Sequence, residues 1–172
     1  MRRNIITGIL IFVAFVLQST LIQAVSLGGI SPDIMMILTV SYGFIRGKKN
    51  GLVTGFCSGI LVDIFFGNVL GFYALVYMYI GYLNGLLHET FFKEDIKLPL
   101  ILVAISNLSY NVIIYILMFL LRRRLNPGIY FVRIIIPEMI YTVLLMLLIY
   151  PLILKINKKF DQIEKRSAKK FV

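Results

Sequence analysis

The chain has 172 residues, of which 59% are hydrophobic, and its mean hydropathy is +0.90. A soluble domain is about half apolar, whereas several apolar runs here reach the roughly 20 residues that cross a bilayer. The composition therefore excludes an ordinary soluble domain and predicts an all-α, multi-span membrane protein. The formal net charge of +10 fits basic residues gathered at cytoplasmic helix ends, so we expect no nucleic-acid partner. The single Cys57 excludes an intramolecular disulfide and a cysteine metal cluster.

The first helix is predicted from an apolar run that extends from Ile5 to about Val25, after Arg2 and Arg3. A signal peptide has the same order, and residues 22–24 are a weak cleavage motif. The run is longer than such peptides use, and further spans follow, so we expect an uncleaved helix whose basic end is cytoplasmic. Its far end carries four polar residues that should face other helices or the interface: Gln18, Ser19, Thr20 and Gln23.

The second helix is predicted to begin just after a turn at residues 27–30. Ser31 suits the N-cap and Pro32 the first helical position, while Asp33 would lie in the first turn, where the helix dipole favours a carboxylate. The helix should extend to about Ile45, roughly 22 Å, which is less than the hydrocarbon core of about 30 Å. It therefore tilts little, thins the bilayer, or begins below the outer surface among other helices. A re-entrant course is the alternative.

The third helix follows a basic turn at residues 46–49 and carries a ladder of residues at every fourth position. A spacing of four forms a slanting groove on a helix, and glycine costs up to about 1 kcal/mol relative to alanine in a helix interior. The groove is thus predicted to pack closely against another helix, either the following one or a helix of another protein. The ladder consists of Gly51, Gly55, Gly59, Asp63, Gly67 and Gly71.

Asp63 is the one acid in this ladder. A carboxylate in hydrocarbon costs about 2.5 to 3.5 kcal/mol on insertion scales, so it should bond to the backbone of a reversal at residues 67–71 or anchor a partner. The fourth helix, at about residues 72–87, has its own small pair, Gly81 and Gly85. We expect the two helices to form a hairpin in which the lower ladder packs internally and the Asp63 end shapes the outer face.

The last two spans are predicted at about residues 98–121 and 132–154, after a polar interfacial connector. Near the start of the last span, Pro137 should kink the helix. The adjacent Glu138 is the acid most expected within the membrane. It either belongs to a functional polar site or pairs with Arg133 or with an asparagine of the fifth helix, which carries Asn107 and Asn111.

Six spans place both termini on one side, and the distribution of basic residues favours the cytoplasm. The predicted domains are a six-helix transmembrane domain at residues 1–154 and a basic cytoplasmic tail at residues 155–172. The tail is either an amphipathic extension on anionic lipid or a solvated flank. Four arginines break the charge bias near the outer face, and we hypothesise that they pair with Asp33 or Asp63: Arg122, Arg123, Arg124 and Arg133.

The order of these features, over residues 15–90, resembles the MreD family of rod shape-determining proteins. The resemblance implies a multi-pass subunit of the elongation machinery in the bacterial cytoplasmic (inner) membrane. Such a subunit works with the bitopic MreC, the actin-like MreB, the RodA glycosyltransferase and its transpeptidase in lateral-wall peptidoglycan synthesis. The motifs that carry it are residues 17–21 (LQSTL), Pro32-Asp33, Arg46-Gly47, the ladder with Asp63, and the Gly81 to Gly85 pair.

Two functions follow from the sequence, and neither is an enzyme, because no catalytic triad, phosphate loop or metal motif appears. No catalytic, cofactor or metal residues are assigned. Under the first function the protein is a scaffold, and the ladder docks a partner's single helix. Under the second, suggested by a helical layout similar to the substrate-binding subunits of energy-coupling-factor transporters, polar residues near the outer face line a pocket for a small, vitamin-like molecule.

Overall fold

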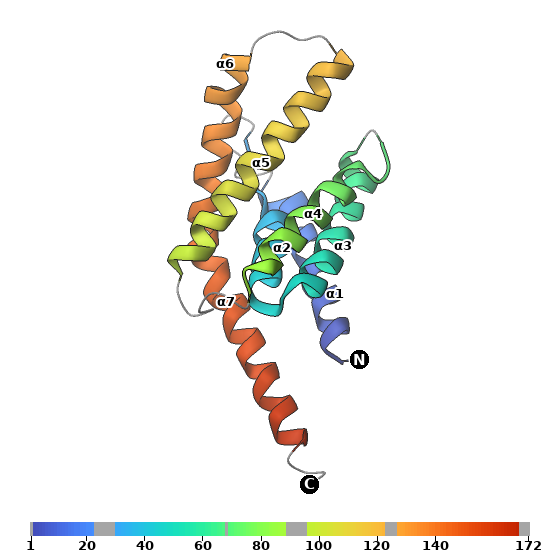
Figure 1. Cartoon of the computed structure of the whole chain (residues 1–172), viewed down its shortest axis with the longest axis vertical. Coiled ribbons are helices and arrows are strands. Elements are labelled where there is room, and N and C mark those ends of the chain that lie inside the picture. The colour runs from blue at the N-terminus through green and yellow to red at the C-terminus, as the bar shows by residue number, and fades with distance from the viewer. Residues whose placement is uncertain (1, 23–29, 68, 89–95, 123–126, 169–172) are drawn as a thin grey trace.

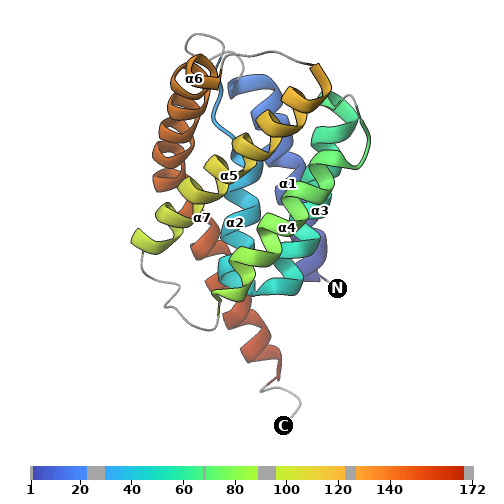
Figure 2. The same cartoon turned by 45° about the horizontal axis from the view of Figure 1, so that its top comes forward.

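The computed structural model describes residues 2–22, 30–67, 69–88, 96–122 and 127–168. Within these ranges the regular elements are helices, and the start of the first helix and the end of the last lie toward the same end of the bundle (Figures 1 and 2). The elements are α1 (Arg2–Leu17), the π-helical turn η1 (Gln18–Ile22), α2 (Ile34–Arg46), α3 (Lys48–Phe66), α4 (Phe72–Leu86), α5 (Lys97–Arg122), α6 (Pro127–Tyr130), the π-helical turn η2 (Phe131–Ile135) and α7 (Ile136–Ala168).

The described helices differ in how far they can reach across a bilayer. Three are long and apolar enough to cross it, at Lys48–Phe66, Lys97–Leu117 and Phe131–Phe160. Two shorter apolar helices lie at Ile5–Thr20 and Ile34–Arg46. The prediction of an all-helical protein suited to a membrane is confirmed, while the count of six spans and the side of the termini stay predictions.

The bundle is organised around α2, which has neighbours on every side. Each residue from Ile34 to Ile45 is buried, and α2 contacts α1, α3, α4, α5 and α7 (Figure 2). With 13 residues it is only about 20 Å long. A helix that protein surrounds has no need to match the thickness of the hydrocarbon, so burial accounts for its short length.

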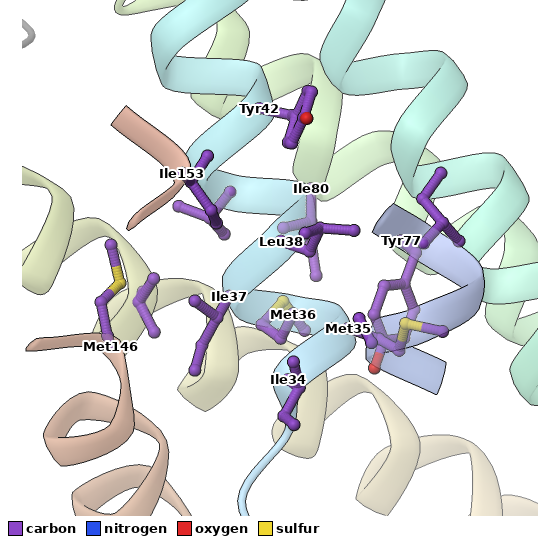
Figure 3. Close-up of a cluster of buried hydrophobic side chains, with 14 of the residues drawn as sticks. Ile34, Met35, Met36, Ile37, Leu38, Tyr42, Tyr77, Ile80, Met146 and Ile153 are labelled. Atoms are coloured by element: carbon purple, nitrogen blue, oxygen red, sulfur yellow. The ribbon is translucent and has the colours of Figure 1, made fainter. Parts of the chain in front are cut away.

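The hydrophobic core surrounds the first turns of α2. Met35, Met36 and Ile37 are completely buried, and side chains from helices on both sides close over them (Figure 3). Tyr77 of α4 lies on one side, and Met146 of α7 lies on the other. Helices that are distant in the sequence therefore pack together around α2, whose residues from Ile34 to Ile45 are all buried.

The hairpin of α3 and α4 depends on backbone contact at the ladder glycines. A Cβ atom on Gly51, Gly55 or Gly59 would approach the α4 backbone to well under 3.0 Å, a distance that real Cβ atoms essentially never show. The atoms it would meet belong to Gly81, Tyr77 and Ala74. These ladder glycines therefore already face α4. Of the two neighbours considered for this groove, α4 is the one that covers these three glycines, as expected for the lower part of the ladder.

A further glycine, Gly43 of α2, joins the same contact. A Cβ atom there would lie 2.6 Å from the carbonyl oxygen of Gly81, and one on Gly51 would lie 2.7 Å from the Cα of Gly43. Three helices thus meet at Gly43, Gly51 and Gly81 without side chains between them. The sequence analysis missed Gly43, although the four-residue spacing continues backwards from Gly51 through Gly47 to Gly43.

The last two ladder glycines form the reversal and not the groove. Gly67 ends α3 and donates its N–H to the carbonyl oxygen of Asp63 at 3.0 Å. Gly71 precedes α4 with a φ of +95° and has open space around its Cα. This left-handed conformation is costly for residues other than glycine, which explains the glycine there.

Two helix starts differ from the sequence predictions. The N-cap of α2 is Asp33, not Ser31, because the Asp33 carboxylate accepts from the N–H of Met36 at 2.9 Å. At Pro137 the expected disturbance takes the form of the π-helical turn η2 just before it. Proline has no N–H to donate to the carbonyl four residues earlier, and that carbonyl, on Arg133, lies in η2.

The last helix continues beyond the predicted end at Leu154. α7 runs to Ala168, with Pro151 inside it. Ile153 and Asn157 are both buried, at 3% exposure each, so packing holds the helix past that point. The predicted boundary between residues 154 and 155 therefore lies inside one continuous helix.

Candidate functional site

A polar cavity of about 350 Å³ lies where η1, the start of α2, and helices α3 to α7 converge. Two carboxylates, four tyrosines and two side-chain amides reach it from helices that are distant in the sequence. The lining residues are Gln18, Ser31, Pro32, Asp33, Val62, Phe66, Tyr73, Tyr77, Tyr110, Asn111, Ile114, Tyr130 and Glu138.

Asp33 connects four segments at this cavity. One carboxylate oxygen caps α2 by accepting from Met36, and the other accepts from the hydroxyl of Tyr77 on α4. Its own backbone N–H donates to the hydroxyl of Thr142 on α7 at 3.1 Å. The N–H of Met35, in the first turn of α2, donates to the side-chain oxygen of Gln18 at 3.0 Å. Asp33 is 6% exposed, and it needs these partners because an unpaired buried polar group is costly.

Glu138 enters the cavity from the first turn of α7. Its Oε1 accepts from Asn107 and from Asn111, both on α5, at 3.2 Å each. Asn111 also bonds to the side chain of Asn107 at 3.2 Å, so the two amides and the carboxylate form one network. Of the two pairings foreseen for Glu138, the structure contains the one with the asparagines of the fifth helix.

Tyrosine rings form much of the cavity wall. Tyr77 and Tyr110 meet edge to face with ring centroids 5.3 Å apart, and Tyr73 approaches Tyr110 at 6.2 Å. Tyr130 stacks on Tyr115 with centroids 5.1 Å apart. Such rings supply apolar area together with hydroxyl groups that both donate and accept. The wall can therefore contact an apolar body and orient a polar group.

Asp63 lies next to the cavity lining and not in it. Its two carboxylate oxygens accept from the N–H groups of Gly71, Tyr73 and Ala74, at 3.0, 2.9 and 2.9 Å. The carboxylate thus caps the start of α4, and its hydrogen bond to the reversal is one of the two roles foreseen. With 2% exposure and three backbone donors, it is a poor anchor for another protein.

The arginine hypothesis receives no support from the described residues. Arg133 is exposed and does not line the cavity. Arg123 and Arg124, and the side chain of Arg122, lie outside what the structure describes. Pairing of these arginines with Asp33 or Asp63 stays a prediction.

The structure brings together Pro32, Asp33 and Glu138 from the sequence candidates, and it adds residues that sequence reasoning missed. Tyr73 and Tyr77 are four residues apart on α4, and this spacing on one helix face was an available signal. Tyr130 comes from a four-residue helix, α6, which has no periodicity to read.

The comparison with protein families assigns the chain. The family model described as rod shape-determining protein MreD matches residues 1–160. The chain belongs to the MreD family. Comparisons with curated proteins and with solved structures gave no match. MreD proteins are membrane proteins that determine rod shape together with the MreC and MreB machinery, and they are not known as enzymes. The resemblance read from residues 15–90 is thus confirmed, and its range extends over most of the chain.

Proposed function

We propose that this MreD protein is a multi-pass protein of the bacterial inner membrane and a non-enzymatic scaffold of the elongation machinery. Its main partner is an MreC-like bitopic membrane protein, which it docks for lateral-wall peptidoglycan synthesis. RodA, its transpeptidase and the actin-like MreB are further partners. The family match over residues 1–160 carries this proposal.

The docking surface for a partner helix lies on the exterior of the bundle. The ladder face of α3 is occupied by α4, as the contacts of Gly55 and Gly59 show. The opposite side of α3 carries exposed large apolar residues, among them Val53, Phe56 and Ile64.

Depletion in a rod-shaped bacterium tests the scaffold role. We expect cells that lose this protein to become round, and an MreC-like bitopic protein to co-purify with the tagged wild type. As a control, the Gly8→Ala variant should restore the rod shape of depleted cells as well as the wild type does, because a Cβ atom at Gly8 meets nothing within 4 Å. Cells that keep their rod shape after depletion would contradict the proposal.

A second function, the small-molecule-binding subunit of a membrane transporter, is favoured by one observation. The polar cavity has the volume of a small-ligand pocket, since such pockets measure about 300 to 1,000 Å³, and side chains from η1, α3, α4, α5, α6 and α7 converge on it. A ligand retained through mild purification and detected by native mass spectrometry would support this function. An empty protein that still maintains rod shape would favour the scaffold alone.

A further inference from the structure

The cavity has an unused hydrogen-bond acceptor on Glu138. Both asparagine bonds go to Oε1, and no described residue donates to Oε2. The Asp33 carboxylate, by contrast, has a donor on each oxygen, from Met36 and Tyr77. A carboxylate oxygen has room for two hydrogen bonds. Glu138 is therefore the group through which the cavity would hold a donor from outside.

The charged residues that are described in the cavity lining are both acidic. Two carboxylates line it, and none of its described lining residues is basic. The partners of Glu138 are neutral amides, and the partner of Asp33 on α4 is a neutral hydroxyl. Buried charges are normally paired with an opposite charge, so this arrangement favours a cation and disfavours a phosphate or a carboxylate ligand.

The residues of the cavity wall and the cavity volume limit the kind of cation that fits. Tyr73, Tyr77, Tyr110 and Tyr130 line the cavity, and aromatic faces attract an organic ammonium or guanidinium group. Apolar side chains complete the wall, from Val62 and Ile114 among others. The volume of about 350 Å³ is at the lower end for small ligands. A compact molecule fits better than a lipid or a peptide.

We infer that the cavity binds a small organic cation, an amine or guanidine on a compact apolar or aromatic body. Its N–H groups donate to Oε2 of Glu138, and its body lies against the tyrosines. This inference names the ligand class for the second proposed function and is independent of the scaffold role. A loss of rod shape tests the scaffold, whereas direct binding tests the cavity.

Binding is measured on the full-length protein in lipid nanodiscs with probes of one shape and three charges. Phenethylamine and phenethylguanidine are the cations, phenylethanol is the neutral match, and phenylacetate is the anion. We expect saturable binding of a cation by calorimetry, at least about tenfold tighter than that of phenylethanol, since a charge-assisted hydrogen bond is lost in the alcohol. Phenylacetate should not bind.

The Glu138→Gln variant locates the site. Glutamine keeps an oxygen for Asn107 and Asn111, so the fold should persist, and cation binding should weaken by about tenfold or more. Glu164→Gln lies 26 residues farther along α7 than Glu138, about 39 Å along the helix axis, and should bind like the wild type. A melting temperature measured without ligand checks that both variants are folded.

Three results would overturn the inference. One is the absence of saturable binding of either cation up to millimolar concentrations. Another is equal affinity for phenethylamine and phenylethanol, which would make the site an apolar pocket only. The last is unchanged cation affinity in Glu138→Gln, which would place the binding elsewhere.

Discussion

The close backbone contact at Gly55 in the hairpin gives a prediction for a single methyl group. In Gly55→Ala the new Cβ would collide with the carbonyl oxygen of Tyr77, and neither backbone can move without disturbing α2. Overpacking of this kind costs about 1 to 3 kcal/mol. We expect Gly55→Ala to unfold at a lower temperature than the wild type in detergent. The unfolding temperature of Gly8→Ala should be unchanged, because a Cβ atom at Gly8 has open space around it. Equal stability of the two variants would argue against tight α3–α4 packing.

A second prediction concerns the cap on α4. Asp63→Ala leaves the N–H groups of Gly71, Tyr73 and Ala74 without their acceptor, and each buried unsatisfied group costs about 1 to 3 kcal/mol. Asp63→Asn retains one oxygen and should be intermediate. Hydrogen exchange at the Tyr73 and Ala74 amides should rise in the same order. If the alanine variant exchanges like the wild type, the carboxylate is not the cap.

Residue-level reasoning from sequence succeeded where one local rule decided the outcome. Asp63 had to find a donor near its own helix end, and it bonds to the reversal. It failed for Asp33, because N-caps at Ser31 and at Asp33, two residues apart, are both locally acceptable. The bond from the carboxylate to Tyr77 and the contact of the Asp33 N–H with Thr142 select the observed one. Those partners are 44 and 109 residues away in the chain, so no local pattern reveals them.

Which helix covers the ladder of α3 could not be settled from the sequence alone. Periodicity shows which residues of a helix share a face, but it does not show what covers that face. The ladder drew attention to α3, whereas α2 is the helix with neighbours on all sides. The polar cavity was equally hidden, because its residues come from seven different segments that meet only after packing.

The extension of α7 leads to a prediction about lipids. Lys155 and Lys159 are exposed on the continuous helix beyond the predicted span, and a basic residue near an anionic surface contributes about 1 kcal/mol. Replacing both by glutamine should lower the number of phosphatidylglycerol molecules retained in native mass spectra. Retention of phosphatidylcholine should stay constant. Loss of both lipids to the same extent, or of neither, would mean that the helix end is a solvated flank.

For the whole molecule, the common end of the two termini predicts a topology. The start of α1 and the end of α7 lie toward the same end of the bundle (Figures 1 and 2), and the basic residues favour the cytoplasm for that end. Fluorescent-protein fusions at either terminus should therefore be bright in the cytoplasm, and alkaline phosphatase fusions inactive. A cysteine introduced at residue 69, between α3 and α4, in a Cys57→Ser background should react with an impermeant reagent from outside. Labelling only from the cytoplasm would refute the six-span topology.

The complete burial of α2 also bears on how the protein is made. The helix leaves the ribosome before α3, α4, α5 and α7, the elements that later surround it. At 13 residues it is shorter than the roughly 20 that insert stably alone, and it carries hydroxyl side chains on Thr39 and Ser41, which are buried in the finished bundle. We therefore expect stable insertion of this segment to wait for its successors, with the insertion machinery retaining an early segment until later ones arrive.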